Sequence, residues 1–158
     1  MCSLADVDSD RTPFFSNKYI LTHNFKNKPE AVEKIFAMKT VAVVGMSPKP
    51  ERPSHYVALY IRENGYRIIP VNPGRSEIAG ETCFPSLSEI DEAVDVVNVF
   101  RRPEYVGPIA EEAVSIGAKA MWLQDHVVNE EAAKLAEDAG LLVVMNDCMM
   151  RRHRQMLG

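Results

Sequence analysis

A glycine, a serine and two basic residues stand between the first strongly apolar segment of the chain and the helical pattern behind it. Gly45 comes directly after Val41–Val44, and Ser47, Lys49 and Arg52 follow in a polar run. A glycine at the tip of a strand lets backbone and phosphate approach closely, and N–H groups at the start of the next helix attract anions. The loop therefore predicts a phosphate site, with a tight turn carrying solvated basic residues as the alternative.

The same loop lacks two common nucleotide-binding motifs. The fingerprint G-x-G-x-x-G would need glycines where Ser47 and Pro50 stand, and the sequence contains no Walker A motif. Asn72 ends the second apolar segment, where NAD-binding domains carry an acidic residue for the ribose. These features argue against an NAD-dependent dehydrogenase.

Residues at the ends of the second and third apolar segments are candidates for the same site. Val71, Asn72 and Pro73 could form a wall against an adenine, or only a strand-ending turn. Phe100 and Arg101 follow the third segment. There Arg101 could meet a phosphate or a pantetheine-like arm, or it could remain solvated.

The end of the fourth apolar segment places an aromatic and an amide side chain in sequence. Trp122, Leu123 and Gln124 stand there, which would place an aromatic and an amide on the same rim as the glycine loop. For Trp122 the core is the favoured place and the rim the alternative, because a tryptophan is more often core than ligand wall.

Five short segments rich in β-branched residues must position these loops. They are residues 41–44, 67–71, 94–99, 118–123 and 141–145, and longer amphipathic stretches separate them. This alternation predicts an α/β fold, a Rossmann-type doubly wound sheet of about five parallel strands flanked by helices. We expect the strand order 3-2-1-4-5, with ligand binding at the carboxyl ends of the strands where the order reverses.

The connecting stretches carry helix signals at their ends. Pro29 and Pro103 suit first-turn positions, and Asn129 is a candidate N-cap. The spacing of apolar residues predicts helices over residues 29–36, 54–64, 87–90, 103–116 and 129–139, and a short final helix in the polar tail 147–158.

Residues 1–27 show no clear periodicity and are interpreted as an N-terminal extension to a domain of residues 28–158. We expect this extension to pack through its aromatic residues, with a partly mobile segment as the alternative. Those residues are Phe14, Phe15, Tyr19 and Phe25.

Composition sets outer limits on function. The chain has 158 residues and a formal net charge of -4, which fits one globular domain and argues against bulk binding of nucleic acid. No apolar stretch approaches the roughly 18–20 residues of a membrane span. Cys2, Cys83 and Cys148 suggest neither a disulfide framework nor a C-x-x-C pair. We expect a cytoplasmic monomer or small homo-oligomer, with no nucleic-acid or membrane partner.

The sequence contains no evident catalytic or metal-binding motif. His23, His55, His126 and His153 lack metal-ligand spacing, so no metal site is predicted, and His55 is expected to be hydrogen-bonded or exposed. Cys148 is interpreted as a buried structural cysteine, with a reactive thiol, exposed and with a depressed pKa, as the alternative.

Six segments taken together resemble a known family. They are Val41–Pro50, Ile69–Pro73, Gly80–Leu87, Val96–Arg101, Trp122–Gln124 and Asn146–Met149. Over residues 30 to 154 the chain resembles the stand-alone CoA-binding domain proteins, related to the nucleotide-binding domain of the succinyl-CoA synthetase α subunit. The resemblance implies that coenzyme A or an acyl-CoA is the ligand.

The resemblance also implies roles along the edge of the sheet. The phosphates would lie at Gly45, Met46, Ser47, Lys49 and Arg52, and the adenine at Val71, Asn72 and Pro73. Phe100 and Arg101 would line the pantetheine path, with Trp122, Leu123 and Gln124 near its far end.

Two departures from the family pattern bear on activity. The sequence lacks the second domain on which the synthetase subunit carries its phosphorylated histidine, so ligase activity in isolation is not expected. Arg152 also stands before His153 where such proteins often have a glutamate.

The leading hypothesis is a non-catalytic CoA-binding module, sensor or regulator. The alternatives are a component of a CoA-ligase or acyl-transfer enzyme acting with a separate chain, and a redox sensor that binds NAD(P) or another nucleotide.

Overall fold

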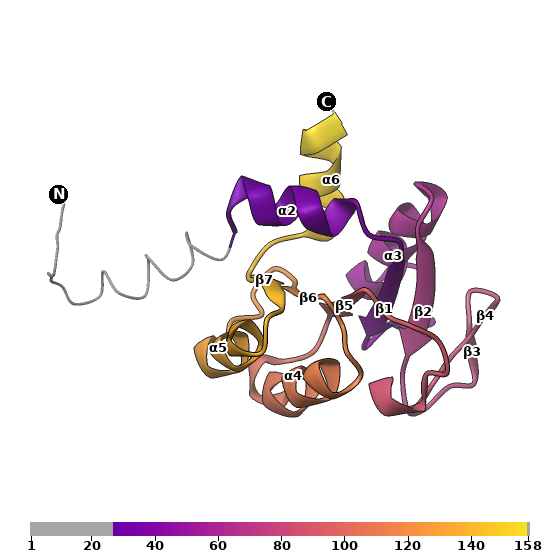
Figure 1. Ribbon diagram of the computed structural model, residues 1–158. Helices are drawn as coiled ribbons and strands as arrows, with labels where there is room; N and C mark the ends of the chain where they lie inside the picture. Colours follow the sequence, from indigo (N-terminus) through magenta and orange to yellow (C-terminus); the bar gives the residue numbers. More distant parts are fainter. Residues whose placement is uncertain (1–26, 158) are drawn as a thin grey trace, which may run out of the picture.

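The computed structural model describes residues 27–157 and contains a five-stranded parallel sheet (Figure 1). Neighbouring strands pair in parallel throughout. In spatial order they are β2 (Arg67–Val71), β1 (Thr40–Val44), β5 (Val96–Val99), β6 (Ala120–Leu123) and β7 (Leu142–Val144). The predicted α/β class and all five predicted strand segments are confirmed.

The predicted strand order is wrong. Counted along the chain, the strands of this sheet lie in the order 2-1-3-4-5, because β5 pairs with β1 rather than with β2. The outer edge of β2 is occupied by Phe84, whose N–H donates to the Pro70 carbonyl at 3.1 Å and whose carbonyl accepts from Asn72 N–H at 2.9 Å. Pro70 has no N–H to offer on that side, which suits an edge position. The point where the strand order reverses therefore lies between β1 and β5.

A small hairpin between β2 and β5 was not predicted. It consists of β3 (Glu77–Ile78) and β4 (Glu81–Thr82), which pair antiparallel. The two residues of its turn, Ala79 and Gly80, both have positive φ, as tight hairpin turns require. The single helical turn η1 (Leu87–Glu89) follows, close to the short helix predicted there.

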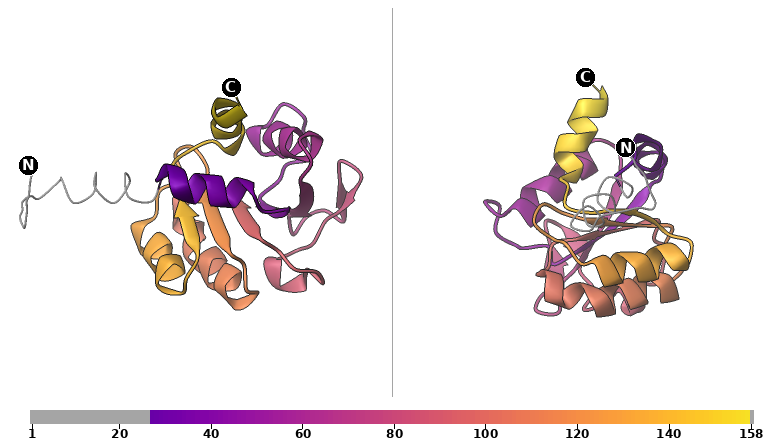
Figure 2. Two further views of the ribbon diagram at one scale, coloured as in Figure 1. Left: turned by 45° about the horizontal axis from the view of Figure 1, so that its top comes forward. Right: turned by 90° about the vertical axis from the view of Figure 1, so that its left-hand side faces the viewer.

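Helices cover both faces of the sheet (Figure 2). On one face lie α2 (Pro29–Phe36), α3 (Pro53–Glu63) and α6 (Met149–Leu157), and on the other lie α4 (Val106–Ser115) and α5 (Glu130–Asp138). Each face has its own core, because alternate residues of a strand point to opposite sides. Within β1, for example, Val41 and Val43 join the α2–α3 core, and Ala42 and Val44 join the α4–α5 core.

The helix ends follow the signals expected of them. Pro29 stands in the first turn of α2, and the side chain of Asn129 accepts a hydrogen bond from Ala132 N–H at 3.0 Å, which caps α5. The helix predicted over 103–116 is instead a short 3-10 turn, η2 (Pro103–Tyr105), followed by α4. The predicted final helix is present as α6.

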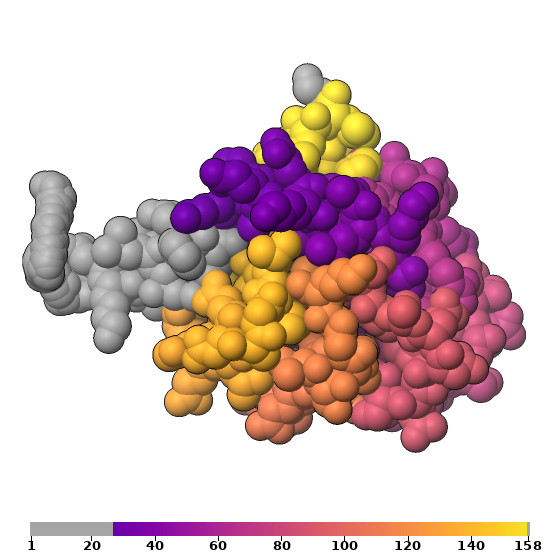
Figure 3. Space-filling view, in the orientation of Figure 1, coloured from indigo at the N-terminus to yellow at the C-terminus, as the bar shows by residue number. Residues whose placement is uncertain are grey.

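A buried histidine fixes α6 against α2 and α3. His153 lies among the rings of Phe36, Tyr60 and Tyr66, at centroid distances of 5.1, 5.5 and 5.9 Å. Its Nδ1 lies 2.9 Å from the Tyr60 hydroxyl. Burial lowers the pKa of His153, so the neutral imidazole is favoured. Figure 3 shows α2 lying beside α6 on this side of the molecule.

Asn27 ties the start of the described chain to β7. Its carboxamide donates to the Met145 carbonyl and accepts from the Met145 N–H, both at 2.9 Å. The proposed extension, with its four aromatic residues, otherwise lies outside the described residues.

Candidate ligand-binding edge of the sheet

Gly45 brings the loop after β1 into close contact with the chain after β5. Its φ is +85°, and its N–H donates to the Val71 carbonyl at 2.9 Å. A Cβ at this position would lie 2.6 Å from the Phe100 carbonyl oxygen and 3.0 Å from Cδ of Arg101. Glycine is therefore required here, because a side chain would be both strained and in collision with backbone.

Short hydrogen bonds hold the loop that follows Gly45. Ser47 N–H donates to Ser54 Oγ at 2.9 Å, and Ser47 Oγ accepts from Lys49 N–H at 3.1 Å. Nδ1 of the buried His55 lies 2.8 Å from the Ser47 carbonyl, so His55 is hydrogen-bonded within the fold, as expected. These bonds keep the Ser47 hydroxyl in the loop while its proton remains free to donate to another acceptor.

The loop presents positive charge at the start of α3. Lys49 and Arg52 are exposed, and within residues 27–157 neither takes part in an ion pair. Arg52 is the N-cap residue of α3, and its side chain makes no capping hydrogen bond. N–H groups in a first helical turn point outward and favour an anion. This end of the loop thus presents two accessible cations that are unpaired within the described residues, with the exposed Glu51 between them in sequence.

Asn72 locks the loop after β1 to the loop after β2. Its Nδ2 donates to the Met46 carbonyl at 3.0 Å, and its Oδ1 accepts from Gly74 N–H at 2.9 Å. Cys83 Sγ donates to the Asn72 carbonyl at 3.5 Å, and burial raises the pKa of this thiol. Asn72 therefore has a structural role as well as a place on the rim, with Pro73 exposed beside it.

Phe100 and Arg101 form the other side of the reversal point. Phe100 N–H donates to the Val44 carbonyl at 2.9 Å. This bond extends the hydrogen bonding between β1 and β5 by one residue beyond the end of β5. The guanidinium of Arg101 lies over the Tyr105 ring, 4.7 Å from its centroid. Tyr105 is itself 46% exposed. A half-buried cation thus stands next to Gly45 with an accessible aromatic ring beneath its guanidinium, and no sequence motif pointed to Tyr105.

Three residues that the resemblance assigned to the ligand site lie in the core. Met46, Trp122 and Leu123 are fully buried. Nε1 of Trp122 donates to the Asp147 carbonyl at 2.9 Å, and its ring packs on Phe36 at 5.4 Å. The core position favoured for Trp122 is therefore confirmed, and this side chain does not reach the ligand as the resemblance implied. The predicted order placed the fourth strand beside the first, whereas β5 separates β6 from β1.

Gln124 is nearly buried and pairs with an amide that sequence reasoning did not single out. Its Nε2 donates to Asn98 Oδ1 at 2.6 Å, and Asn98 is fully buried within β5. The signal for this pair was a polar residue inside an apolar strand, Val96–Val99. Such a residue needs a partner, because an unpaired buried amide costs about 1–3 kcal/mol.

Beyond this pair, the edge of the sheet is closed by an ionic cluster under α6. Arg151 donates to both Asp125 oxygens at 3.0 and 2.9 Å and to Asp147 at 2.9 Å, and Arg152 donates to Asp147 at 2.6 Å. Hydrogen bonding to Arg151 lowers the pKa of Asp125. The arginines of this region are therefore neutralised within the fold.

The structure thus brings together one group of predicted site residues and separates another. Gly45, Ser47, Asn72, Phe100 and Arg101 converge at the reversal point between β1 and β5. Lys49, Arg52 and Pro73 are exposed in the loops beside it, and Val71 is buried at the end of β2. Chemically, this arrangement can bind an anion through N–H groups and cations and can support a flat ring.

Two classes of feature are absent from the part of the chain that the structure describes. Residues 27–157 hold no group of three or more metal-ligating side chains, and none of their helices is long and apolar enough to cross a membrane.

Comparisons with known proteins show relatives of this chain in sequence and in fold. A model of the CoA binding domain family matches residues 39–154. The uncharacterized protein YneT of Bacillus subtilis is 42% identical over 127 residues, which are 80% of this chain and 94% of YneT. A solved structure of a hypothetical protein from Pyrococcus horikoshii has a TM-score of 0.80 at 42% identity, covering 83% of this chain and 93% of that one.

Larger enzymes contain a related region. Acetate–CoA ligase (ADP-forming) I of Archaeoglobus fulgidus is 27% identical over 128 residues, which are 75% of this chain and 19% of the ligase. This chain therefore spans about a fifth of that enzyme's length.

Proposed function

Because the chain belongs to the family of CoA-binding domains, we propose that it binds coenzyme A or an acyl-CoA as a non-catalytic module, sensor or regulator. The binding site in this proposal is the edge of the sheet between β1 and β5. The observation that carries it is the approach of Gly45 to Phe100 beside two exposed cations that no carboxylate of residues 27–157 neutralises.

The phosphates of the ligand are the part best matched by this chain. Lys49 and Arg52 can each form a charge-assisted hydrogen bond, and the Ser54 N–H in the first turn of α3 adds one backbone donor, since Pro53 has no N–H and the N–H groups of His55 and Tyr56 donate to the Arg52 carbonyl. Gly45 has no side chain to keep a phosphate from the backbone. The Ser47 hydroxyl supplies one further donor.

The adenine and the pantetheine arm of the ligand are assigned to the neighbouring loops. In this proposal the adenine lies near Pro73 and the Asn72 backbone, and the pantetheine arm crosses Phe100 and Arg101. Met46, Trp122, Leu123 and Gln124 contribute by supporting the rim residues from beneath, since they are buried.

Isothermal titration of the ligand-free full chain with CoA tests the proposal. We expect saturable binding by wild type and a loss on the order of 3 kcal/mol, over a hundredfold in affinity, in Lys49→Ala/Arg52→Ala. The matched control Lys119→Ala/Lys134→Ala removes the same charge from exposed sites outside this edge and should leave the affinity within about threefold.

Each outcome of the titration has a defined meaning. Undiminished binding in the loop variant would move the phosphates elsewhere on the molecule. Absence of binding by folded wild type, at millimolar CoA, would remove the ligand. Competition in which NADH binds far more tightly than CoA would favour the redox-sensor alternative instead.

The same proposal includes that the protein does not catalyse a reaction of its ligand. We expect thioester turnover of acetyl-CoA at the background rate, equal in wild type and in Cys148→Ser, whose thiol is half-buried in wild type. Turnover above background that disappears in Cys148→Ser would instead make the protein an acyl-transfer enzyme. The free thiols Cys83 and Cys148 support our further expectation of a reducing, cytoplasmic setting.

A further inference from the structure

An apolar stripe runs along the outer side of α3, away from the sheet. Tyr56, Leu59, Tyr60 and Glu63 recur at three- and four-residue spacing and share one face of the helix. Tyr56 is 44% exposed, while Leu59 and Tyr60 are half-buried. The stripe ends in the exposed carboxylate of Glu63, at the last residue of α3.

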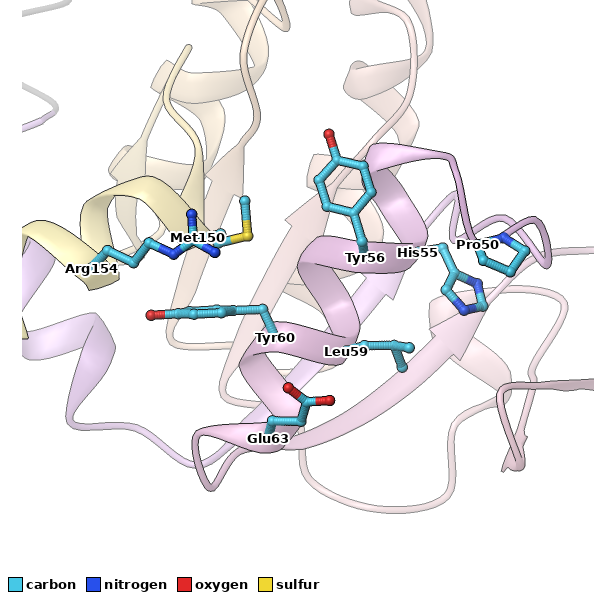
Figure 4. A pocket seen from close by; sticks show the side chains of 8 residues that line it. All are labelled: Pro50, His55, Tyr56, Leu59, Tyr60, Glu63, Met150 and Arg154. Atoms are coloured by element: carbon cyan, nitrogen blue, oxygen red, sulfur yellow. The ribbon is translucent and has the colours of Figure 1, made fainter.

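A second stripe with the same spacing runs along α6 and faces the first. Met150, Arg154 and Leu157 lie on one side of α6, and Leu157 is 69% exposed. The Arg154 guanidinium lies over the Tyr60 ring at 5.1 Å, which joins the two stripes. Figure 4 shows Tyr60 extending from α3 toward α6 and Arg154 extending back.

Between the stripes lies an open hollow of about 510 Å³. Pro50 and His55 border the end of it nearest the loop after β1, and Glu63 borders it from the end of α3 (Figure 4). Tyrosine, methionine and arginine, which make up half of its lining, are residue types enriched in protein interfaces. Exposed side chains of these types, gathered along two neighbouring helices, are suited to a protein contact.

The charges of the hollow complement one another within a single copy. Arg154 is an exposed cation on α6, and Glu63 is an exposed anion on α3, and neither makes an ion pair within residues 27–157. A two-fold axis through the hollow would place Arg154 of each copy opposite Glu63 of the other. An isologous contact forms each such pair twice.

We propose that this face of α3 and α6 binds a second copy of the chain, forming a two-fold symmetric dimer. Tyr56 and Met150 supply the apolar centre of the contact, and the exchanged Arg154–Glu63 pairs fix its register. The inference does not depend on CoA binding, because the stripes lie on the outer side of α3 rather than at the strand ends.

Sedimentation equilibrium of the full chain at about 200 µM, in the micromolar range of dimer affinities, tests the proposal. Wild type should have about twice the mass of the 17.7 kDa chain. Glu63→Arg and Arg154→Glu, each placing like charges opposite one another twice, should raise the dissociation constant at least tenfold. The double variant Glu63→Arg/Arg154→Glu should restore the dimer, because both pairs are re-formed with opposite sign.

Two further variants separate interface from fold. Tyr56→Ser changes an exposed side chain and should also raise the dissociation constant at least tenfold, while Lys134→Glu on α5 should leave it unchanged. A wild-type protein of single-chain mass overturns the proposal. A dimer that survives Glu63→Arg, Arg154→Glu and Tyr56→Ser overturns this surface as its interface, and a double variant that stays monomeric overturns the two-fold pairing.

Discussion

The two halves of the carboxyl edge of the sheet carry similar charges and use them differently. Over β1 and β5, Lys49 and Arg52 are exposed without a carboxylate partner among the described residues. Over β6 and β7, Arg151 and Arg152 are held by Asp125 and Asp147. One half is open, with two accessible cations, and the other is closed under α6.

This difference shows that a basic sequence does not identify an anion site. The segments 47–52 and 151–154 are both basic in sequence, and only the structure shows which cations are already neutralised. A paired guanidinium has little left to offer a phosphate, whereas an unpaired exposed cation next to a helix N-terminus has both charge and access. We therefore expect the affinity for an anionic ligand to depend on residues of the open half.

The largest effect is expected from a Cβ at the centre of the open half. Gly45→Ala should lower the free energy of unfolding by on the order of 3 kcal/mol, because its φ of +85° strains alanine and its Cβ meets the Phe100 carbonyl at 2.6 Å. CoA affinity should fall with it. Urea denaturation and titration with CoA measure the two losses.

Gly65→Ala is the matched control for this variant. Gly65 has a similar φ of +98°, but nothing lies within 4 Å of its Cβ position. It should cost about 1 kcal/mol from backbone strain alone and leave CoA affinity unchanged. Equal losses in the two variants would mean that the contact between Gly45 and Phe100 contributes nothing.

A smaller effect, in stability alone, is expected from opening the closed half. Asp147→Asn removes the buried carboxylate shared by Arg151 and Arg152 and should lower the free energy of unfolding by about 2 kcal/mol. Asp125→Asn, whose partner is exposed, should cost less than about 1 kcal/mol. CoA affinity should stay within about threefold in both variants. A hundredfold loss in Asp147→Asn would place the ligand over the closed half.

The smallest effect is expected from pH, acting on the contact that holds α6. Burial lowers the pKa of His153 in the folded chain, so between its folded and unfolded pKa values the unfolded chain binds more protons. The contribution of the neutral His153 to the free energy of unfolding should therefore be complete above the pKa of the unfolded chain, near 6.5. It should decrease as pH falls below that value. Chemical denaturation at pH 7.5, 6.5 and 5.5 measures the slope.

Two variants assign this pH dependence. His153→Phe should reduce the slope, since the titrating group is gone while a ring remains among Phe36, Tyr60 and Tyr66. Tyr60→Phe keeps the buried imidazole and should retain the slope. A slope that persists unchanged in His153→Phe would assign the pH dependence to another group.

The sequence predicted the elements of the fold well and their lateral order poorly. Apolar segments and caps such as Asn129 are local signals, and they place strands and helices without reference to the rest of the chain. The order of strands depends on which edges remain free. Pro70 carried the missing information, because a proline inside a strand belongs at a sheet edge, and the predicted order placed that strand between two others.

The residues of the candidate site likewise divide into those with a local sequence signal and those that depend on contacts between distant segments. Gly45, Lys49 and Arg52 were identifiable because a glycine after a strand and cations before a helix are adjacent in sequence. Burial of Trp122 and its hydrogen bond to Asp147 depend on contacts with α2 and the chain after β7, which sequence spacing does not reveal. Asn98 could have been found from its polarity within β5, but its partner Gln124 could not be identified without the strand order.

The carboxamide of Asn27 has a consequence for how the molecule behaves among its own copies. β7 is the last strand of the sheet, and an edge strand with free N–H and carbonyl groups is a template for pairing with another chain. Asn27 occupies both groups of Met145, the residue just after β7, much as a strand residue would. Its side chain thereby shortens the exposed template, and a chain trimmed to begin after residue 27 would be more prone to aggregate through this edge.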